Sequence, residues 1–333
     1  MDSLQYSIII PVYNAESTVV STVESVLNQT VGGYEIILVN DGSTDLSGKI
    51  LDELADKYEA VKVFHQDNQG PNYGRYTGIK NANGNYLMFL DADDLWDNDL
   101  LENINKYNKN YDLVIYNARI INDGKTIYDK PIFDIDGESE VIDKDTVLYK
   151  TYFSSDNNEV WKKAFKRTLF TEEMLADSFD LRTSEDLLLS VRMVQTANTI
   201  LYIDKCMYNH IDNPLGITNN IRLSDINDTF FVRSKILEMI SDEKEKEQYA
   251  RYIQKRVAGM VIQICENGKI KKKIELLKAI RENNIDNLIK YTDSNSEISV
   301  LYRIVIKLLY KEKYGTLLAY SRCFLLLKKL FSR

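Results

Sequence analysis

The sequence is poor in cysteine, in clustered basic residues and in long apolar runs. Its three cysteines, Cys206, Cys265 and Cys323, lack the close spacing of a metal site, and their odd number argues against a disulfide framework. We therefore expect a reducing compartment. No uninterrupted run of 18 apolar residues occurs, which excludes an ordinary membrane-spanning helix. The formal charge is −8, and no basic cluster interrupts the first 300 residues, which argues against nucleic acid as a partner.

The phosphate-binding loops of two nucleotide-binding folds are also missing. The stretch "GSTDLSGKI" has five residues between Gly42 and Gly48 and an Ile after Lys49, whereas a P-loop needs four and then Ser or Thr. No G-x-G-x-x-G follows the first apolar run, which excludes the dinucleotide-binding fingerprint. The N-terminal "MDSLQYSIII" lacks the basic segment of a signal peptide, so we expect a cytoplasmic location.

What the chain does contain is a regular alternation of apolar runs and helical patterns over its first 120 residues. Helical periodicity occurs between the apolar runs, for example over 19–27, where Asn14 is the expected N-cap. The alternation predicts an α/β fold in which a mostly parallel sheet is flanked by helices. The runs expected to form strands buried on both faces are 6–12, 34–40, 60–66, 85–91 and 111–121.

The pattern changes twice further along the chain. Turn signals at "NDGK" and "IDGE" predict hairpins within residues 122–150. Beyond about residue 222 the strand signal disappears and helical patterns dominate. We therefore expect a boundary near residue 220, with an α/β domain over 1–220 and a helical C-terminal region over 221–333.

The end of the chain is basic and amphipathic. From Arg303 onward there are eight Lys or Arg residues and one Glu, a net charge of +7. A helical wheel of the segment 299–333 places Cys323 on an apolar side and Ser321 on a basic side. Such a helix lies on an anionic membrane surface, packs on a partner such as a second copy of the chain, or docks on its own domain. The sequence leaves these alternatives open.

Acidic and Asn-rich stretches follow three of the expected strands: "YNAE", "VNDGSTD" and "DADD". Each alone is consistent with an ordinary turn or helix start. The carboxyl ends of parallel strands meet at one sheet edge, where ligands bind and where unneutralised carboxylates would repel one another. Together the stretches fit a site in which carboxylates bind a base or ribose and a hard divalent cation that neutralises a diphosphate.

Four stretches, in this order and spacing, resemble the family 2 glycosyltransferases with the GT-A fold: "SIIIPVYNAE", "VNDGSTD", "NQGPNYGRYTGIKNANGNYLMFLDADD" and "SEDLLL". The resemblance covers about residues 5–218. It implies an inverting transferase that uses a nucleotide-diphosphate sugar and a divalent metal, Mn²⁺ or Mg²⁺. Gly74 and Tyr76 stand where the family has Ala and Asn, and Gly216 stands where it has Ser, so the contacts of those positions do not carry over.

Carried over by position, the resemblance implies two groups of binding residues. Asp41 would accept a hydrogen bond from the base, which favours uracil, and Arg75 would lie near the base or the diphosphate. Asp91 and Asp93 form the D-x-D pair, with Asp93 on the metal and Asp91 on the ribose or on the metal through water. His210 is a further metal or diphosphate ligand, or else a structural hydrogen-bonder. The residues that would border the nucleotide are Pro11, Val12, Tyr13 and Glu16.

The resemblance also implies a catalytic acidic pair, Glu185 and Asp186, in which Asp186 is the base. An inverting transfer is a single in-line displacement, so a carboxylate opposite the leaving diphosphate must take the proton of the acceptor hydroxyl. The same two residues are equally suited to the first turn of a helix over the following apolar residues. Both roles are compatible.

The expected activity is transfer of a hexosyl or N-acetylhexosaminyl group from a UDP-sugar to a hydroxyl of a growing glycan. The acceptor is a capsule or exopolysaccharide repeat on a lipid carrier, or a protein-linked glycan. The basic tail favours the lipid-linked acceptor and a peripheral position on the inner face of the membrane; a homodimer is the other use of the tail. One rival is a sugar-1-phosphate nucleotidyltransferase, although "PVYNAESTVV" offers a triphosphate no basic residue. The other is an inactive nucleotide- or glycan-binding relic.

Overall fold

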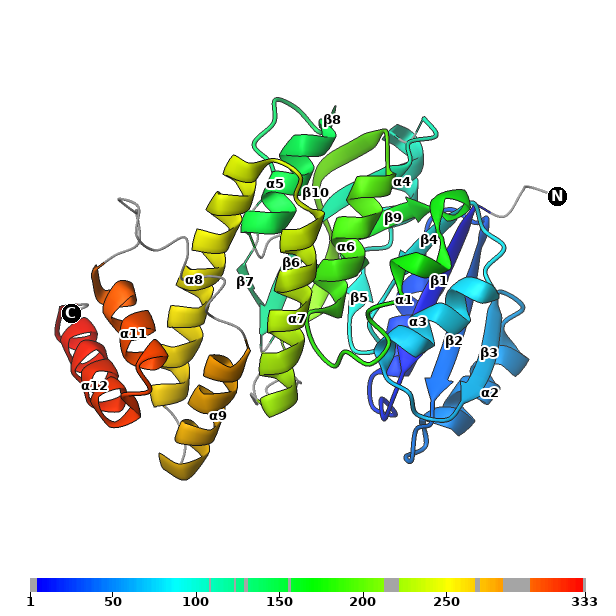
Figure 1. The fold of residues 1–333 in the computed structure, drawn as a ribbon. Coiled ribbons are helices and arrows are strands. Elements are labelled where there is room, and N and C mark those ends of the chain that lie inside the picture. The colour runs from blue at the N-terminus through cyan, green and yellow to red at the C-terminus, as the bar shows by residue number, and fades with distance from the viewer. Residues whose placement is uncertain are drawn as a thin grey trace. The chain divides into compact units, whose positions relative to one another are not determined.

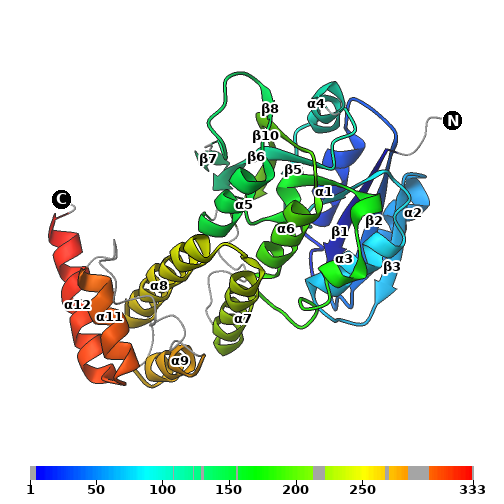
Figure 2. The same ribbon diagram turned by 45° about the horizontal axis from the view of Figure 1, so that its top comes forward.

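The computed structural model describes residues 5–107, 109–122, 124–128, 131–154, 157–212, 222–266, 270–283 and 300–331. The chain forms two compact units, residues 1–219 and 220–333 (Figures 1 and 2).

Within the described residues, the first unit is built on a ten-stranded sheet with the order β3-β2-β1-β4-β9-β6-β10-β5, to which β7 and β8 attach through β6 and β10 (Figure 1). All five expected strands are present, with ends that differ by three residues or fewer. The strands are β1 (Tyr6–Val12), β2 (Tyr34–Asp41), β3 (Val61–Gln66), β4 (Tyr86–Phe89), β5 (Leu95–Trp96), β6 (Leu113–Asn122), β7 (Lys125–Tyr128), β8 (Ser139–Val141), β9 (Lys163–Lys166) and β10 (Ile200–Ile211).

The sheet is parallel in its first half and mixed in its second. Strands β1 to β4 are parallel to one another, whereas β9 lies antiparallel between β4 and β6. β6 and β10 are again parallel, and β6 and β7 form one of the expected hairpins. The expectation of a mostly parallel sheet therefore describes the first half only. β9 directly follows the short 3₁₀ turn η1 (Val160–Lys162).

Helices cover both faces of this sheet. Alternate side chains of β1 point to opposite faces, so Ile8 and Ile10 pack with α1, α2 and α4, while Ile9 packs with α3, α5 and α6. Burial on both faces is the reason why these strands consist of continuous apolar runs. The helices are α1 (Val19–Leu27), α2 (Ser47–Lys57), α3 (Pro71–Lys80), α4 (Leu100–Tyr107), α5 (Lys144–Phe153) and α6 (Glu185–Thr196), with 3₁₀ turns η2 (Arg167–Leu169) and η3 (Glu172–Met174).

The expected N-cap of α1 is wrong. The helix begins at Val19, and its N-cap is Thr18, four residues beyond Asn14. Asn14 instead adopts a positive φ of 50°, its Oδ1 accepts a hydrogen bond from the Thr44 backbone N (2.8 Å), and its own N donates to Ser43 Oγ (3.1 Å). The side chain therefore joins the loop after β1 to the loop after β2, a partnership that a helix periodicity does not reveal.

The second unit is helical in its described residues, as expected. Its helices are α7 (Leu223–Met239), α8 (Glu243–Glu266), α9 (Ile270–Glu282), α11 (Val300–Tyr310) and α12 (Tyr314–Phe331). α11 and α12 pack against each other and against α8. The part of the chain that the structure describes has no helix long and apolar enough to cross a membrane.

The helical wheel of the tail was wrong at two positions. Leu317 and Ser321, one turn apart, are fully buried within the second unit, whereas Cys323 is exposed. The helix is therefore rotated about its axis relative to the orientation that the apolar residues alone predict. Packing against α8 and α11 determines which side of α12 is buried. Residues 299, 332 and 333, and the side chains from 324 onward, lie outside the description.

Candidate functional site

The loops after β1 and β2 are joined by hydrogen bonds from backbone N–H groups to side-chain carboxylates. Glu16 Oε2 accepts from the Leu46 backbone N (2.8 Å), and the Glu16 N donates to Asp45 Oδ2 (3.1 Å). Pro11 and Val12 end β1, and Tyr13 leaves the strand with 53% of its surface exposed. The joined loops thus present one exposed aromatic ring at the carboxyl edge of the sheet.

Asp41 ends β2 and organises the segment that leads into α3. Its Oδ1 accepts hydrogen bonds from Gln66 Nε2 (2.7 Å) and the Gln69 N (2.9 Å), and its Oδ2 accepts from the Gly70 N (2.8 Å). The two carboxylate oxygens together offer about four acceptor positions, so one remains for a further donor. Asp41 therefore has a structural role in addition to the base contact expected of it.

Arg75 on α3 connects two carboxylates at the start of α6, far away in the sequence. Its Nη1 donates to Asn72 Oδ1 (2.9 Å) and to Glu185 Oε1 (3.3 Å), and its Nη2 lies 2.9 Å from Asp186 Oδ1. The Arg75 side chain is only 5% exposed. Burial alone would lower its pKa, but attraction from Asp186, Glu185 and Asp91 raises the pKa above its ordinary value. A permanent cation thus binds the expected base and is also attracted by Asp91 of the D-x-D pair.

The carboxyl groups around Arg75 are crowded. Burial raises the pKa of Glu185 to about 7; repulsion from Asp186 adds to the shift and Arg75 opposes it. Burial also raises the pKa of Asp91 to about 8; repulsion from Asp94 adds to it, Arg75 opposes it, and Asp186 and Asp93 add to it again. One guanidinium therefore does not neutralise this edge, and a further cation would be bound favourably.

Asp94, the last residue of "DADD", faces β10 instead of solvent. It is fully buried, and its Oδ2 accepts from Tyr208 Oη (2.7 Å) and lies 3.0 Å from His210 Nδ1. The hydrogen bond that His210 donates to Asp94 raises the pKa of His210 to about 9, although burial opposes this shift. The structure therefore places His210 beside the end of the D-x-D strand. There it contacts Asp94, for which we expected no ligand contact.

Trp161, in the turn before β9, covers this pair of side chains. Its ring stacks on Tyr208 with centroids 4.2 Å apart and on His210 with centroids 5.7 Å apart. Lys162 Nζ lies 5.3 Å from the Trp161 ring centroid. Trp161 thus belongs to the packing that supports the site.

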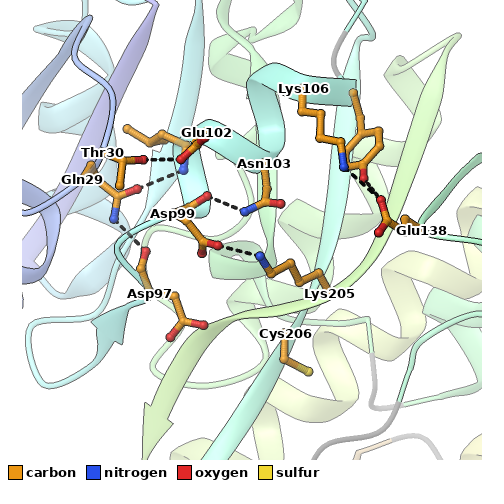
Figure 3. Close-up of polar contacts among 12 residues, drawn as sticks. Gln29, Thr30, Asp97, Asp99, Glu102, Asn103, Lys106, Glu138, Lys205 and Cys206 are labelled. Carbon is orange, nitrogen blue, oxygen red and sulfur yellow. Dashed lines mark hydrogen bonds and ion pairs between the residues drawn. The ribbon is translucent and has the colours of Figure 1, made fainter.

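β10 reaches Asp94 only because its pairing with β6 is irregular. The register shifts between Ile203 and Cys206 and again between Cys206 and Tyr208. Arg119 Nη2 donates to the Cys206 carbonyl (2.7 Å), and Lys205 binds Asp99 (2.6 Å) ahead of α4 (Figure 3). Inserted residues change which face the later side chains point to, so the bulges orient Tyr208 and His210.

The turn that carries Trp161 is held by a buried lysine, Lys163. Its Nζ donates to the carbonyls of Asn157 (2.9 Å) and Glu159 (2.6 Å), two acceptors that a neutral amine with two N–H bonds can satisfy. Burial lowers the pKa of Lys163 from 10.5 to about 7; repulsion from Lys162 adds to the shift, and Glu159 and Asp186 oppose it. The folded protein therefore disfavours the ammonium form.

Replacing Lys163 with Met should remove a pH-dependent part of the stability. Between pH 7 and 10.5 the unfolded chain binds a proton that folded Lys163 does not, so this group makes the wild type more stable as pH rises, by about 1 kcal/mol per pH unit. Urea unfolding of wild type and Lys163→Met at pH 7.5, 8.5 and 9.5 measures the difference. Lys166→Met, on the same strand but paired with Asp112, is the control. Equal pH slopes for wild type and Lys163→Met would contradict the prediction.

The structure brings most of the expected site residues close enough for their charges to influence one another's pKa values at one edge of the sheet. These residues are Arg75, Asp91, Asp93, Glu185, Asp186 and His210. The sequence analysis did not single out Tyr208, which donates to Asp94 and stacks on Trp161. One signal was available, because Tyr208 and His210 are two apart on a strand and therefore share a face. Gly216 lies outside the described residues.

Comparison with known proteins locates the chain among sugar transferases. The family model described as "Glycosyl transferase family 2" matches residues 7–177. Over 217 residues, 64% of this chain and 62% of the relative, it is 29% identical to the uncharacterized glycosyltransferase EpsJ of Bacillus subtilis. Over 213 residues, 61% of this chain and 30% of the relative, it is 30% identical to the glycosyltransferase GlyA of Streptococcus pneumoniae. The matches span less than two thirds of these relatives.

Solved structures show the same fold. The structure of S. aureus TarS 1–349 in complex with UDP-GlcNAc superposes with a TM-score of 0.72 at 17% sequence identity, covering 96% of this chain and 91% of that chain. The same fragment bound to UDP gives a TM-score of 0.68. The expected GT-A fold with a helical C-terminal region is thereby confirmed.

Proposed function

The chain belongs to glycosyltransferase family 2, and on that premise we propose that it is an inverting transferase acting on a UDP-sugar. The observation that carries the proposal is the position of Arg75, which binds Glu185 and Asp186 and also attracts Asp91. One buried cation thus holds the expected catalytic base next to the expected nucleotide and metal ligands. A helix start without a catalytic role would not need this contact with α3.

The nucleotide is proposed to lie on the loops after β1 and β2. Tyr13 offers an exposed ring there, bordered by Pro11, Val12 and Glu16, and Asp41 retains an acceptor position for a base N–H. The UDP and UDP-GlcNAc complexes of TarS support a UDP-sugar donor. A hexosyl or N-acetylhexosaminyl group is the proposed cargo.

A divalent cation, Mn²⁺ or Mg²⁺, fits the chemistry of this edge. The crowded carboxyl groups are the oxygen donors that such ions prefer, and Mg²⁺ is commonly held by one or two carboxylates together with substrate phosphates. Among the described residues no three His, Cys, Asp or Glu side chains form a group that could hold a metal ion. Asp93, Asp91 and His210 are the proposed ligands. The cation would supply charge neutralisation for the departing diphosphate.

Asp186 is the proposed general base. It takes the proton of the acceptor hydroxyl as that oxygen attacks the anomeric carbon and the bond to UDP breaks, so configuration inverts. Its position in the first turn of α6 stabilises the carboxylate through the helix dipole, and Arg75 fixes its orientation. Glu185 shares Arg75 and completes the acidic pair.

The acceptor is proposed to be a hydroxyl of a growing glycan, either a capsule or exopolysaccharide repeat on a lipid carrier or a protein-linked glycan. Residues 1–220 are proposed to bind donor and acceptor, and 221–333 to form a helical region ending in the basic segment. Docking of α12 through Leu317 and Ser321 uses one side of that helix. Peripheral contact with the cytoplasmic face of the membrane, or a homodimer, remains the proposed use of 299–333.

UDP release from a panel of UDP-sugars, with Mn²⁺, Mg²⁺ or EDTA, tests the proposed function. We expect turnover of one donor, only with metal, and loss of that turnover in Asp93→Ala, because the leaving diphosphate is then no longer neutralised. A nucleotidyltransferase would instead require a nucleoside triphosphate or pyrophosphate. If no donor is turned over and calorimetry detects no UDP binding with Mn²⁺, the proposal is wrong.

A further inference from the structure

We propose that Asp94 is a positioning residue that holds His210 with only its Nε2 free for the divalent cation. The inference rests on the proposed function, because the cation is the one proposed to neutralise the diphosphate. Asp94 itself is fully buried and is not one of the proposed ligands. This positioning role explains why the acidic strand end contains a third aspartate beyond the D-x-D pair.

The contacts of Asp94 hold the imidazole in one orientation. Its Oδ2 lies 3.0 Å from His210 Nδ1, and its Oδ1 accepts from the Ile211 backbone N (2.8 Å). Tyr208 Oη donates to the same Oδ2 (2.7 Å). The His210 side chain is 39% exposed, and no described residue binds its Nε2. The ring is thus held through Nδ1, while Nε2 is the nitrogen at which a cation can bind by displacing its proton.

Two further features favour a ligand-binding histidine over a purely structural one. Trp161 stacks nearly parallel to the His210 ring, with 12° between the planes, which fixes the ring in the plane of its Asp94 hydrogen bond. The charges of Asp91 and Asp93 also act on His210, so the imidazole lies close to the D-x-D pair. Histidines that bind metals commonly donate their second N–H to a carboxylate, which fixes the ring and its tautomer.

The variant Asp94→Asn separates this role from packing. It preserves size, and the amide oxygen can still accept from Tyr208 or Ile211. Its NH₂ group, however, donates to Nδ1, which then requires the proton on Nε2 and removes the lone pair that would bind the cation. We therefore expect Mn²⁺ titrated into the UDP-saturated protein to bind 10–100-fold more weakly in Asp94→Asn than in wild type. UDP binding in EDTA should not change.

Two variants make the measurement specific. The chain has only two histidines, and the other, His65, lies 3.0 Å from the exposed Asp52. Asp52→Asn therefore alters a matched His–carboxylate pair away from the site. This variant should bind Mn²⁺ like wild type. In a His210→Ala background, Asp94→Asn should weaken Mn²⁺ binding no further, because its effect passes through the imidazole. A loss that persists in that background would show a merely structural role for Asp94 and overturn the inference.

A second readout does not require the variant to fold. In wild type with Mg²⁺ and UDP, ¹⁵N NMR of the histidines, assigned with His65→Gln, should show His210 protonated at Nδ1 and not at Nε2. The opposite tautomer would overturn the inference. Wild-type protein that binds no Mn²⁺ in the presence of UDP would instead refute the proposed function, so the two failures are distinguishable.

Discussion

Asp186→Asn should abolish sugar transfer while leaving UDP binding intact. The amide has the same shape as the carboxylate but cannot accept the proton of the acceptor hydroxyl, so we expect kcat to fall by about 10²–10⁴-fold. Arg75 keeps its contacts with Glu185 and Asn72, so the start of α6 should retain its position. Steady-state UDP release at saturating donor gives kcat, and calorimetry gives the affinity for UDP with Mn²⁺.

Glu185→Gln is the matched control, since it changes the neighbouring acid in the same helical turn. The side-chain oxygen of the new glutamine can still accept from Arg75 Nη1, and the variant leaves the proposed base Asp186 on Arg75 Nη2. We expect a smaller fall in kcat than for Asp186→Asn. If Glu185→Gln is the more damaging variant, the roles within the acidic pair are reversed.

Arg75→Met should destabilise the first unit strongly. Removing one partner of a buried ion pair leaves uncompensated charge, which costs about 3–5 kcal/mol of unfolding free energy. Here Glu185, Asp186 and Asp91 all lose the cation that attracts them. Urea unfolding of wild type and variant measures the loss, and UDP release should fall with it because Asp186 is no longer oriented.

The pH dependence of this loss follows from the carboxyl groups. Those of Glu185 and Asp91 already have raised pKa values, so the folded protein binds protons that the unfolded chain has released between about pH 4 and 8. Stability due to these groups therefore falls as pH rises. Without Arg75 this fall should steepen, making Arg75→Met most damaging near pH 8 and least near pH 5.

Arg192→Met is the control for loss of an arginine from an ion pair, because Arg192 lies on the same helix α6 and binds the more exposed Asp177. A partly exposed pair contributes about 1 kcal/mol or less. An equal loss for Arg192→Met and Arg75→Met, or an Arg75→Met loss independent of pH, would show that the Arg75 cluster has no special electrostatic role.

The positions of the expected ligands followed from local patterns. Apolar runs such as 6–12 and 34–40 predict buried strands because burial on both faces requires apolar side chains throughout. Each run ends where polar residues begin, so the ends of β1, β2 and β4, and with them Asp41 and Asp91, were predictable. The acidic pair at the start of α6 was predictable from the polar-to-apolar change after Asp186.

Other contacts were not predictable because they join segments distant in the sequence. Asn14 looked like a helix cap but binds the loop after β2, and β9 inserts antiparallel into a sheet whose first strands are parallel. Ser321 is buried although it is polar, because the packing of α12 places it on the buried side of the helix. In each case tertiary packing outweighed the local preference.

For this protein the sequence by itself determined which strands form, where they end, and which acidic residues stand at those ends, since these depend on neighbouring residues alone. Only the tertiary structure decided how those acids are used. The bulges of β10 turn His210 toward Asp94, and the ion pairs of Arg75 with Glu185 and Asp186 join α3 to the start of α6. Charges separated by more than ninety residues are coupled only after folding places them together in a site of low dielectric constant.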